Sequence, residues 1–177
     1  MGKQMPNDSI ATLIAKEEIR ELVALYSRGI NRRDFDLLQS LYTADATDNH
    51  GRSFFASIPA FIARLREVLP QQRHGSLFVC NHLIEVNGSL ANGEVYALSY
   101  HFFPDGSGGW AEHEMRLRYV DTYRREGAHW RFATRTLVID HHAVRPVSAS
   151  EAGQAELTDD PSYRFAGSRL FSAGPRT

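Results

Sequence analysis

The segment from Glu21 to Arg52 constrains the fold most, because its apolar pattern changes along its length from helical to strand-like. Near its start, apolar residues recur at spacings of three and four and therefore share one helix face: Ile19, Leu22, Val23, Tyr26 and Ile30. The polar run 31–34 breaks this pattern, and Asp34 is the predicted N-cap of a second helix that ends near Tyr42. A strand is expected to follow at about Asp48–Phe55.

One further helix and four long strands complete the predicted secondary structure. The first helix is expected from about Ser9 to Gly29, and another is expected to begin after Ser57 and to end at Pro70. The strands are predicted at Ser76–Asn87, Glu94–Phe103, Trp110–Arg124 and Ala128–His141.

Turn-forming residues separate these strands. Asn87-Gly88 and Glu126-Gly127 are predicted to be turns, Asn92-Gly93 is predicted to open the second strand, and a flexible loop is expected at 104–109. Helices followed by a run of antiparallel strands predict an α+β fold, in which three helices from the N-terminal half cover one face of a curved sheet. We expect one domain over residues 1–145.

The two ends of the chain are predicted to form tails. Residues 1–8 are expected to form a loose tail, and residues 146–177 a polar C-terminal tail that packs on the domain or on a neighbouring subunit. Tyr163-Arg164-Phe165 and Leu170-Phe171 are the segments of this tail that carry apolar anchors.

Composition excludes several classes of function. A net charge of −1 gives no general attraction to nucleic acid or to an anionic membrane, so neither is expected as a partner. No apolar run approaches the roughly 20 residues that span a bilayer, and the N-terminus lacks a signal-peptide pattern, so cytoplasm is the expected compartment. A single cysteine, Cys80, excludes an internal disulfide and a multi-cysteine metal site.

Alternation along the strands identifies the side chains that face the interior. In the strand Trp110–Arg124 the interior set is His113, Met115, Leu117 and Tyr119. In the strand Glu94–Phe103 one set combines small residues with a histidine and a phenylalanine: Ala97, Ser99, His101 and Phe103. Because small side chains leave room, this second set suits the wall of a cavity.

Three histidines are candidates for proton transfer, since imidazole titrates near neutrality. His101 has the cavity-facing parity, and the alternative is a core or interface histidine. His113 heads an apolar row, and for it too the alternative is a core or interface histidine. His50 and Asp48 can form a pair that orients a base, although we expect this strand end to be exposed.

No metal or cofactor site is predicted. The adjacent histidines His141 and His142 point to opposite faces of a strand, so one metal ion would not take both. The glycine-rich loop at 106–109 lies between strands rather than before a helix, unlike a phosphate-binding loop.

Three segments in order resemble the SnoaL-like branch of the nuclear transport factor two-like superfamily: IRELVALYSRGINRRDFDLLQSLYTADA, NHLIEVNG and YVDTYRREGAHWRFATRTLVIDH. The resemblance covers about residues 10–145. It implies a cone-shaped α+β barrel with an apolar pocket between helices and sheet. Relatives include scytalone dehydratase, lindane dehydrochlorinase and lyases that release formaldehyde from lignin-derived diaryl compounds. They generally use no cofactor, and many are trimers.

The resemblance assigns roles to individual residues. Tyr26 matches a tyrosine that can polarise a carbonyl or stabilise an enolate, and Asn31 falls where relatives carry an aspartate. Asn31 can hold a substrate oxygen, or it can cap a helix. The catalytic histidine of the relatives would fall near Phe78, so this chain lacks it. A second polar catalytic position of the relatives falls approximately on His101. The acid–base pair of the relatives is therefore not intact.

The predicted substrate is an apolar aromatic small molecule. Its expected contacts are Asp48, Phe55, Phe78, Asn81, Phe103, Trp110, Met115 and Tyr119. The leading hypothesis is a cofactor-independent lyase that eliminates water, halide or formaldehyde by histidine acid–base chemistry. The alternatives are a non-catalytic small subunit of a ring-hydroxylating dioxygenase, and an isomerase or cyclase of steroid or polyketide type. We expect a homo-oligomer, with a trimer favoured.

Overall fold

The computed structural model describes residues 10–51, 54–152 and 160–165. The helices are α1 (Ile10–Arg32), α2 (Phe35–Ser40) and α3 (Ile58–Val68), with short 3₁₀ turns η1 (Leu69–Gln71) and η2 (Pro161–Arg164). The strands are β1 (Tyr42–Asn49), β2 (Phe55–Ser57), β3 (His74–Asn87), β4 (Leu90–Pro104), β5 (Trp110–Glu126) and β6 (His129–Val147). Among the described residues, none of the helices combines the length and apolar content of a membrane-spanning segment.

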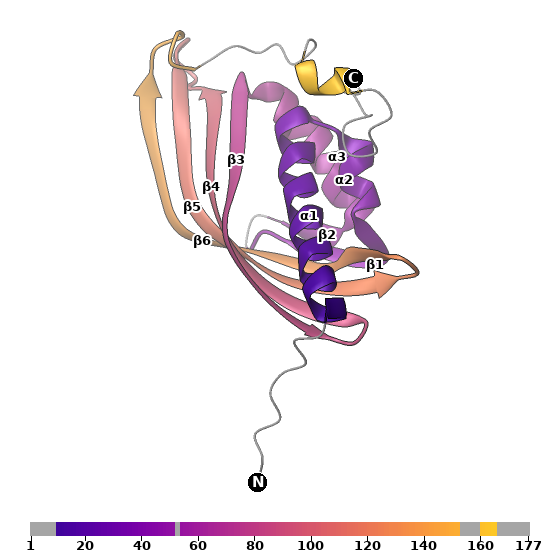
Figure 1. Cartoon of the computed structure of the whole chain (residues 1–177). Helices are drawn as coiled ribbons and strands as arrows, with labels where there is room; N and C mark the ends of the chain where they lie inside the picture. Colours follow the sequence, from indigo (N-terminus) through magenta and orange to yellow (C-terminus); the bar gives the residue numbers. More distant parts are fainter. Residues whose placement is uncertain (1–9, 52–53, 153–159, 166–177) are drawn as a thin grey trace.

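The strands form one six-stranded sheet in the order β2-β1-β6-β5-β4-β3. The sheet bends strongly, and the three helices lie on its concave side (Figure 1). The α+β class and the helices of the N-terminal half are thereby confirmed. The sheet is mixed rather than wholly antiparallel, because β1 pairs parallel to β6.

Helix α1 is the element that closes the concave side of the sheet. Its predicted apolar face is buried, and Ile19 and Val23 have almost no exposed surface. Burying a side chain of this size stabilises the fold by roughly 1.5–3 kcal/mol. The C-terminal half of α1 is tied to β3, where the Ser27 hydroxyl donates a hydrogen bond to the Leu77 carbonyl at 2.6 Å.

The second helix is shorter than the pattern predicted. Asp34 is its N-cap, as expected, and its carboxylate accepts a hydrogen bond from Leu37 N at 3.0 Å. The prediction that the helix continues to Tyr42 is wrong, because β1 already begins there. Tyr42 pairs with Phe132 of β6, a partner far away in the sequence, and that pairing overrides the local helical pattern.

Two of the three predicted strand turns are confirmed. Gly88 and Gly127 have φ angles of 63° and 61° at the hairpin ends, a conformation that suits glycine. The prediction that Asn92-Gly93 opens β4 is wrong, because the strand begins at Leu90. A Cβ on Gly93 would lie 2.8 Å from the Tyr123 ring, so this glycine serves a close side-chain approach inside the strand.

Part of the C-terminal tail is described, and it lies against α1. Strand β6 extends to Val147, past the expected domain boundary at residue 145. Beyond it, the Arg32 guanidinium forms an ion pair with Asp160 at 2.6 Å, and both terminal nitrogens of Arg28 donate to the Ser162 hydroxyl. The expectations for residues 1–8, for the Ser9 cap and for Leu170-Phe171 fall outside the described residues.

Candidate active site

A cavity of about 230 Å³ lies between the helices and the concave face of the sheet. Its helical wall comes from α1, α3 and η1: Tyr26, Ile30, Phe61, Leu65, Val68 and Leu69. Its sheet wall comes from β3, β4, β5 and β6: Leu77, Ser99, His101, Phe103, Met115, Leu117, Tyr119 and Leu137. His50 and Gln72 complete the lining. The lining is mostly apolar, so its few polar side chains determine what chemistry it can support.

His50 reaches the cavity from the end of β1, and Asp48 on the same strand lies beside it. His50 Nε2 is 2.7 Å from Asp48 Oδ1. The Asp48 side chain is fully buried, and its second oxygen accepts a 2.8 Å hydrogen bond from the Tyr42 hydroxyl. The expectation that this strand end is exposed is therefore wrong, since the packing of Tyr42 against Phe61 and Phe132 covers it.

The contact between His50 and Asp48 is close but is not aligned as an ideal hydrogen bond. Neither His50 Nε2 nor Asp48 Oδ1 makes a hydrogen bond of good geometry to any described residue. In ligand-free sites, such bonds are often poorly aligned and tighten only when substrate binds. The carboxylate can hold a proton on Nε2, which leaves Nδ1 as the basic nitrogen.

His101 enters the cavity from β4, on a strand that β6 and β5 separate from β1. Its Nδ1 lies 3.0 Å from Gln72 Oε1, an acceptor, so Nδ1 carries the proton and Nε2 is the accepting nitrogen. Burial lowers the pKa of His101 to about 4, with a smaller contribution from the neighbouring His113 and His74. His101 is therefore neutral near pH 7 and presents Nε2 as a hydrogen-bond acceptor.

Two tyrosines of the cavity lining lie against a buried cation. The Arg135 guanidinium carbon is 4.1 Å from the ring centroids of both Tyr26 and Tyr119. Arg135 is fully buried and forms a bidentate pair with Asp121, through Nε at 2.9 Å and Nη2 at 2.7 Å. Desolvation raises the pKa of Tyr119 to about 12 and that of Tyr26 well above its ordinary value, so both hydroxyls stay protonated as donors.

The structure brings part of the predicted site together in this cavity. The residues that line it are Tyr26, His50, His101, Phe103, Met115 and Tyr119. Asp48 lies directly behind His50 and contacts the imidazole rather than the cavity space.

The other predicted residues lie elsewhere. Asn31 uses both atoms of its amide on the backbone of Leu77, at 3.1 and 2.7 Å, so it fixes α1 to β3. His113 contacts His142, since His113 Nδ1 lies 3.3 Å from His142 Nε2. Trp110 lies under the Arg73 guanidinium at the start of β5. Exposed side chains with no place in the cavity are Phe55, Phe78 and Asn81.

Gln72 is the polar cavity residue that sequence reasoning did not single out. It follows η1 in a connecting segment, where no periodicity indicates a direction, and only the fold brings it to His101. Ser99, in contrast, was placed on the cavity face from the sequence, because it lies two residues before His101 on the same strand. No cluster of three or more His, Cys, Asp or Glu side chains suited to a metal ion occurs within the described ranges.

A curved sheet closed by helices around an apolar pocket with acid–base side chains defines the nuclear transport factor two-like class of proteins. Within that class, the sequence matches the model of the SnoaL-like domain over residues 11–136, so the chain belongs to the SnoaL-like family. No curated protein matches the sequence.

Solved structures share this fold at low sequence identity. A candidate scytalone dehydratase from Novosphingobium aromaticivorans superposes with a TM-score of 0.68 at 20% identity, over 77% of this chain and 93% of that one. The hexachlorocyclohexane dehydrochlorinase LinA, type 2, gives 0.68 at 18% identity over 78% and 92%. A candidate aromatic ring hydroxylase from N. aromaticivorans gives 0.64 at 17% identity over 77% and 94%.

Proposed function

We propose that this protein is a cofactor-independent lyase that eliminates a small group from an apolar, oxygenated aromatic molecule. The observation that carries the proposal is the Asp48–His50 pair at a mostly apolar cavity. A buried carboxylate beside an imidazole is the arrangement that orients a general base and stabilises the imidazolium formed when the base takes a proton.

In this mechanism His50 removes a proton from a substrate carbon, the electrons of the C–H bond form the new double bond, and water or halide departs with the electrons of its own bond to carbon. For loss of formaldehyde, His50 instead removes the proton of the hydroxymethyl O–H. The O–H electrons form the C=O bond of formaldehyde, and the electrons of the broken C–C bond stay on the remaining substrate carbon. Negative charge then develops on a substrate oxygen or on the leaving group. Tyr26 and Tyr119 are protonated donors on the cavity wall that can stabilise this charge, and the Arg135 cation lies behind both rings.

His101 has a different role from the one we predicted from the sequence. With a pKa of about 4 it is a weak base near neutrality, so we assign it to orienting the substrate through Nε2. Gln72 fixes the tautomer that presents this nitrogen. His50, with its carboxylate partner, replaces His101 as the proposed base.

The size of the cavity narrows the substrate class. Its volume of about 230 Å³ lies below the roughly 300–1,000 Å³ common for ligand pockets, so it suits a compact molecule of one or two rings. This argues against the steroid or polyketide substrates of the isomerase alternative. Two of the similar structures carry the names of enzymes that eliminate water or hydrogen chloride, which supports the reaction class.

A screen of compact aromatic alcohols, halides and hydroxymethyl compounds tests the proposal. Ligands that raise the melting temperature are incubated with the protein, and mass spectrometry detects loss of water, hydrogen halide or formaldehyde. Turnover that disappears in His50→Gln supports the proposal. Tight binding with conversion to an isomer of unchanged mass would favour an isomerase, and binding without any conversion would contradict an enzymatic role.

A second candidate function is that of an assembly module. The observation that favours it is the outer face of the sheet, where large apolar side chains are exposed: Phe78, Leu83, Tyr96 and Val120. Light scattering distinguishes the enzyme from the assembly module by the mass of the purified protein. A catalytic homo-oligomer assembles without a partner, and we expect it to be a trimer. A monomer that assembles only with a larger catalytic subunit would favour the module.

A further inference from the structure

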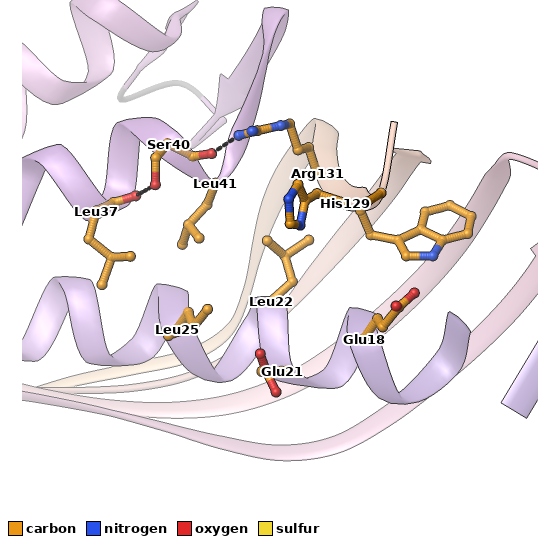
Figure 2. Close-up of a pocket in the computed structure, with 11 residues that line it drawn as sticks. Glu18, Glu21, Leu22, Leu25, Leu37, Ser40, Leu41, His129 and Arg131 are labelled. Atoms are coloured by element: carbon orange, nitrogen blue, oxygen red, sulfur yellow. Dashed lines mark hydrogen bonds between the residues drawn. The ribbon is translucent and has the colours of Figure 1, made fainter. Parts of the chain in front are cut away.

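A second pocket lies on the other side of α1 and shares no residue with the candidate active site. It has a volume of about 370 Å³ and lies between α1, the end of α2 and the start of β6. Figure 2 shows Glu18 and Leu22 on α1, with His129 and Arg131 of β6 across the pocket. The proposed lyase mechanism uses none of these side chains.

The floor of this pocket is apolar. It is formed by four leucines, Leu22, Leu25, Leu37 and Leu41, of which Leu22 and Leu41 are buried and the other two are half-buried. Such a surface binds the apolar part of a ligand by removing it from water.

Two polar groups at the pocket are buried without a hydrogen-bond partner in the described part of the chain. One is Glu18 Oε2, and the other is the indole Nε1 of Trp130. The Trp130 side chain is 5% exposed, so its N–H has little access to bulk water. Buried polar groups of this kind are normally paired, and an unpaired one is a place where a ligand gains a hydrogen bond.

The charges around the pocket favour a cation. Glu18 and Glu21 both line it from α1. The one arginine of the lining, Arg131, is already engaged, because it donates to the Ser40 carbonyl and lies 3.7 Å from Glu126. A ligand ammonium group would therefore meet an unpaired carboxylate next to an indole ring, which also attracts cations.

We propose that this pocket binds a small organic cation, a primary ammonium group on an apolar body, with the ammonium on Glu18 and the body on the leucines. A hydroxyl or carbonyl next to the ammonium would also satisfy the Trp130 N–H. The site is separate from the proposed lyase reaction, and either can fail without the other.

Tryptophan fluorescence provides a direct measurement, because the chain has two tryptophans. In a Trp110→Phe background the emission reports on Trp130 alone. Titration with 2-phenylethylammonium should change this emission saturably, with a Kd at least about tenfold lower than that of 2-phenylethanol, which lacks the charge. 3-Phenylpropionate, which carries the opposite charge, should bind more weakly than the alcohol.

The two glutamates provide a matched pair of variants. Glu18→Gln should weaken binding of 2-phenylethylammonium by roughly 10–100-fold, because it removes the charge from the carboxylate that carries the buried Oε2 while keeping the shape. Glu21→Gln removes the same charge from an exposed side chain and should change Kd by less than about threefold. Circular dichroism confirms that both variants are folded.

Three results would overturn the proposal. They are an unchanged emission at millimolar 2-phenylethylammonium, equal or tighter binding of 3-phenylpropionate, and equal losses in the two glutamine variants.

Discussion

His50 Nε2 lies 2.7 Å from Asp48 Oδ1, and this carboxylate has no exposed surface. Asp48 lies in β1, and His50 directly follows Asn49, the last residue of that strand. Because Asp48 is also held by the Tyr42 hydroxyl at 2.8 Å, the carboxylate cannot turn away from the imidazole without losing a buried hydrogen bond. The pair is therefore a fixed feature of the core that reaches the cavity.

The first prediction concerns this pair. His50→Gln should lower turnover by about 10²–10⁴-fold, the range typical for removal of a general base. Asp48→Asn should lower it by a smaller factor, since the imidazole remains. Steady-state kinetics on the substrate identified by screening measures both effects. Near-normal turnover in His50→Gln, together with a large loss in His101→Phe, would return the role of base to His101.

The second prediction concerns pH and stability. Burial lowers the pKa of His101 to about 4, and that of His82 to about 4 as well, from 6.5. Between pH 6.5 and 4 the unfolded chain therefore binds more protons than the native one, so stability falls as pH decreases through this window. His101 alone should account for roughly 3 kcal/mol of the loss. Half-buried His82 should contribute less, because solvent screens it.

Urea unfolding at several pH values measures this dependence. His101→Gln should flatten the curve between pH 6.5 and 4, and a double variant with His82→Gln should flatten it further. Equal slopes in the wild type and in His101→Gln would show that burial does not shift the pKa of this imidazole.

The third prediction concerns the buried ion pair. Arg135→Met leaves the fully buried Asp121 carboxylate without its cation, and should lower the free energy of unfolding by about 3–5 kcal/mol. Adding Asp121→Asn removes the orphaned charge while keeping an acceptor for the Tyr123 hydroxyl, so the double variant should recover part of the loss. Chemical denaturation gives the values. A loss below about 1 kcal/mol in Arg135→Met would mean that water reaches Asp121.

The fourth prediction concerns the docked tail. Asp160→Ala breaks the ion pair with Arg32 and the hydrogen bonds that Asp160 accepts from Ser162. Hydrogen exchange in residues 160–165 should become faster, while global stability changes by at most about 1 kcal/mol, as for other partly exposed pairs. Ser150→Ala, an exposed hydroxyl earlier in the tail, serves as the control. Unchanged exchange in residues 160–165 would show that other contacts hold this segment on α1.

The local sequence determined the three helices, the four long strands β3–β6, the Asp34 cap and the hairpin turns at Gly88 and Gly127. These features depend on periodicity, on capping groups and on glycine's access to positive φ, all of which are properties of neighbouring residues. Strand parity also placed His101 and Tyr119 at the cavity, since alternate side chains of one strand share a face. The single strand predicted at Asp48–Phe55 was wrong, because the chain forms β1 at Tyr42–Asn49 and β2 at Phe55–Ser57.

Only the tertiary structure decided which polar groups are available for chemistry. Asn31 looked like a site residue, but the approach of β3 commits its amide to the backbone of Leu77. Asp48 looked exposed, but the parallel pairing of β1 with β6 brings Tyr42 and Phe132 together and buries it. Pairings between residues far apart in the chain set burial and hydrogen-bond partners, and these in turn set charge and basicity, which local pattern does not encode.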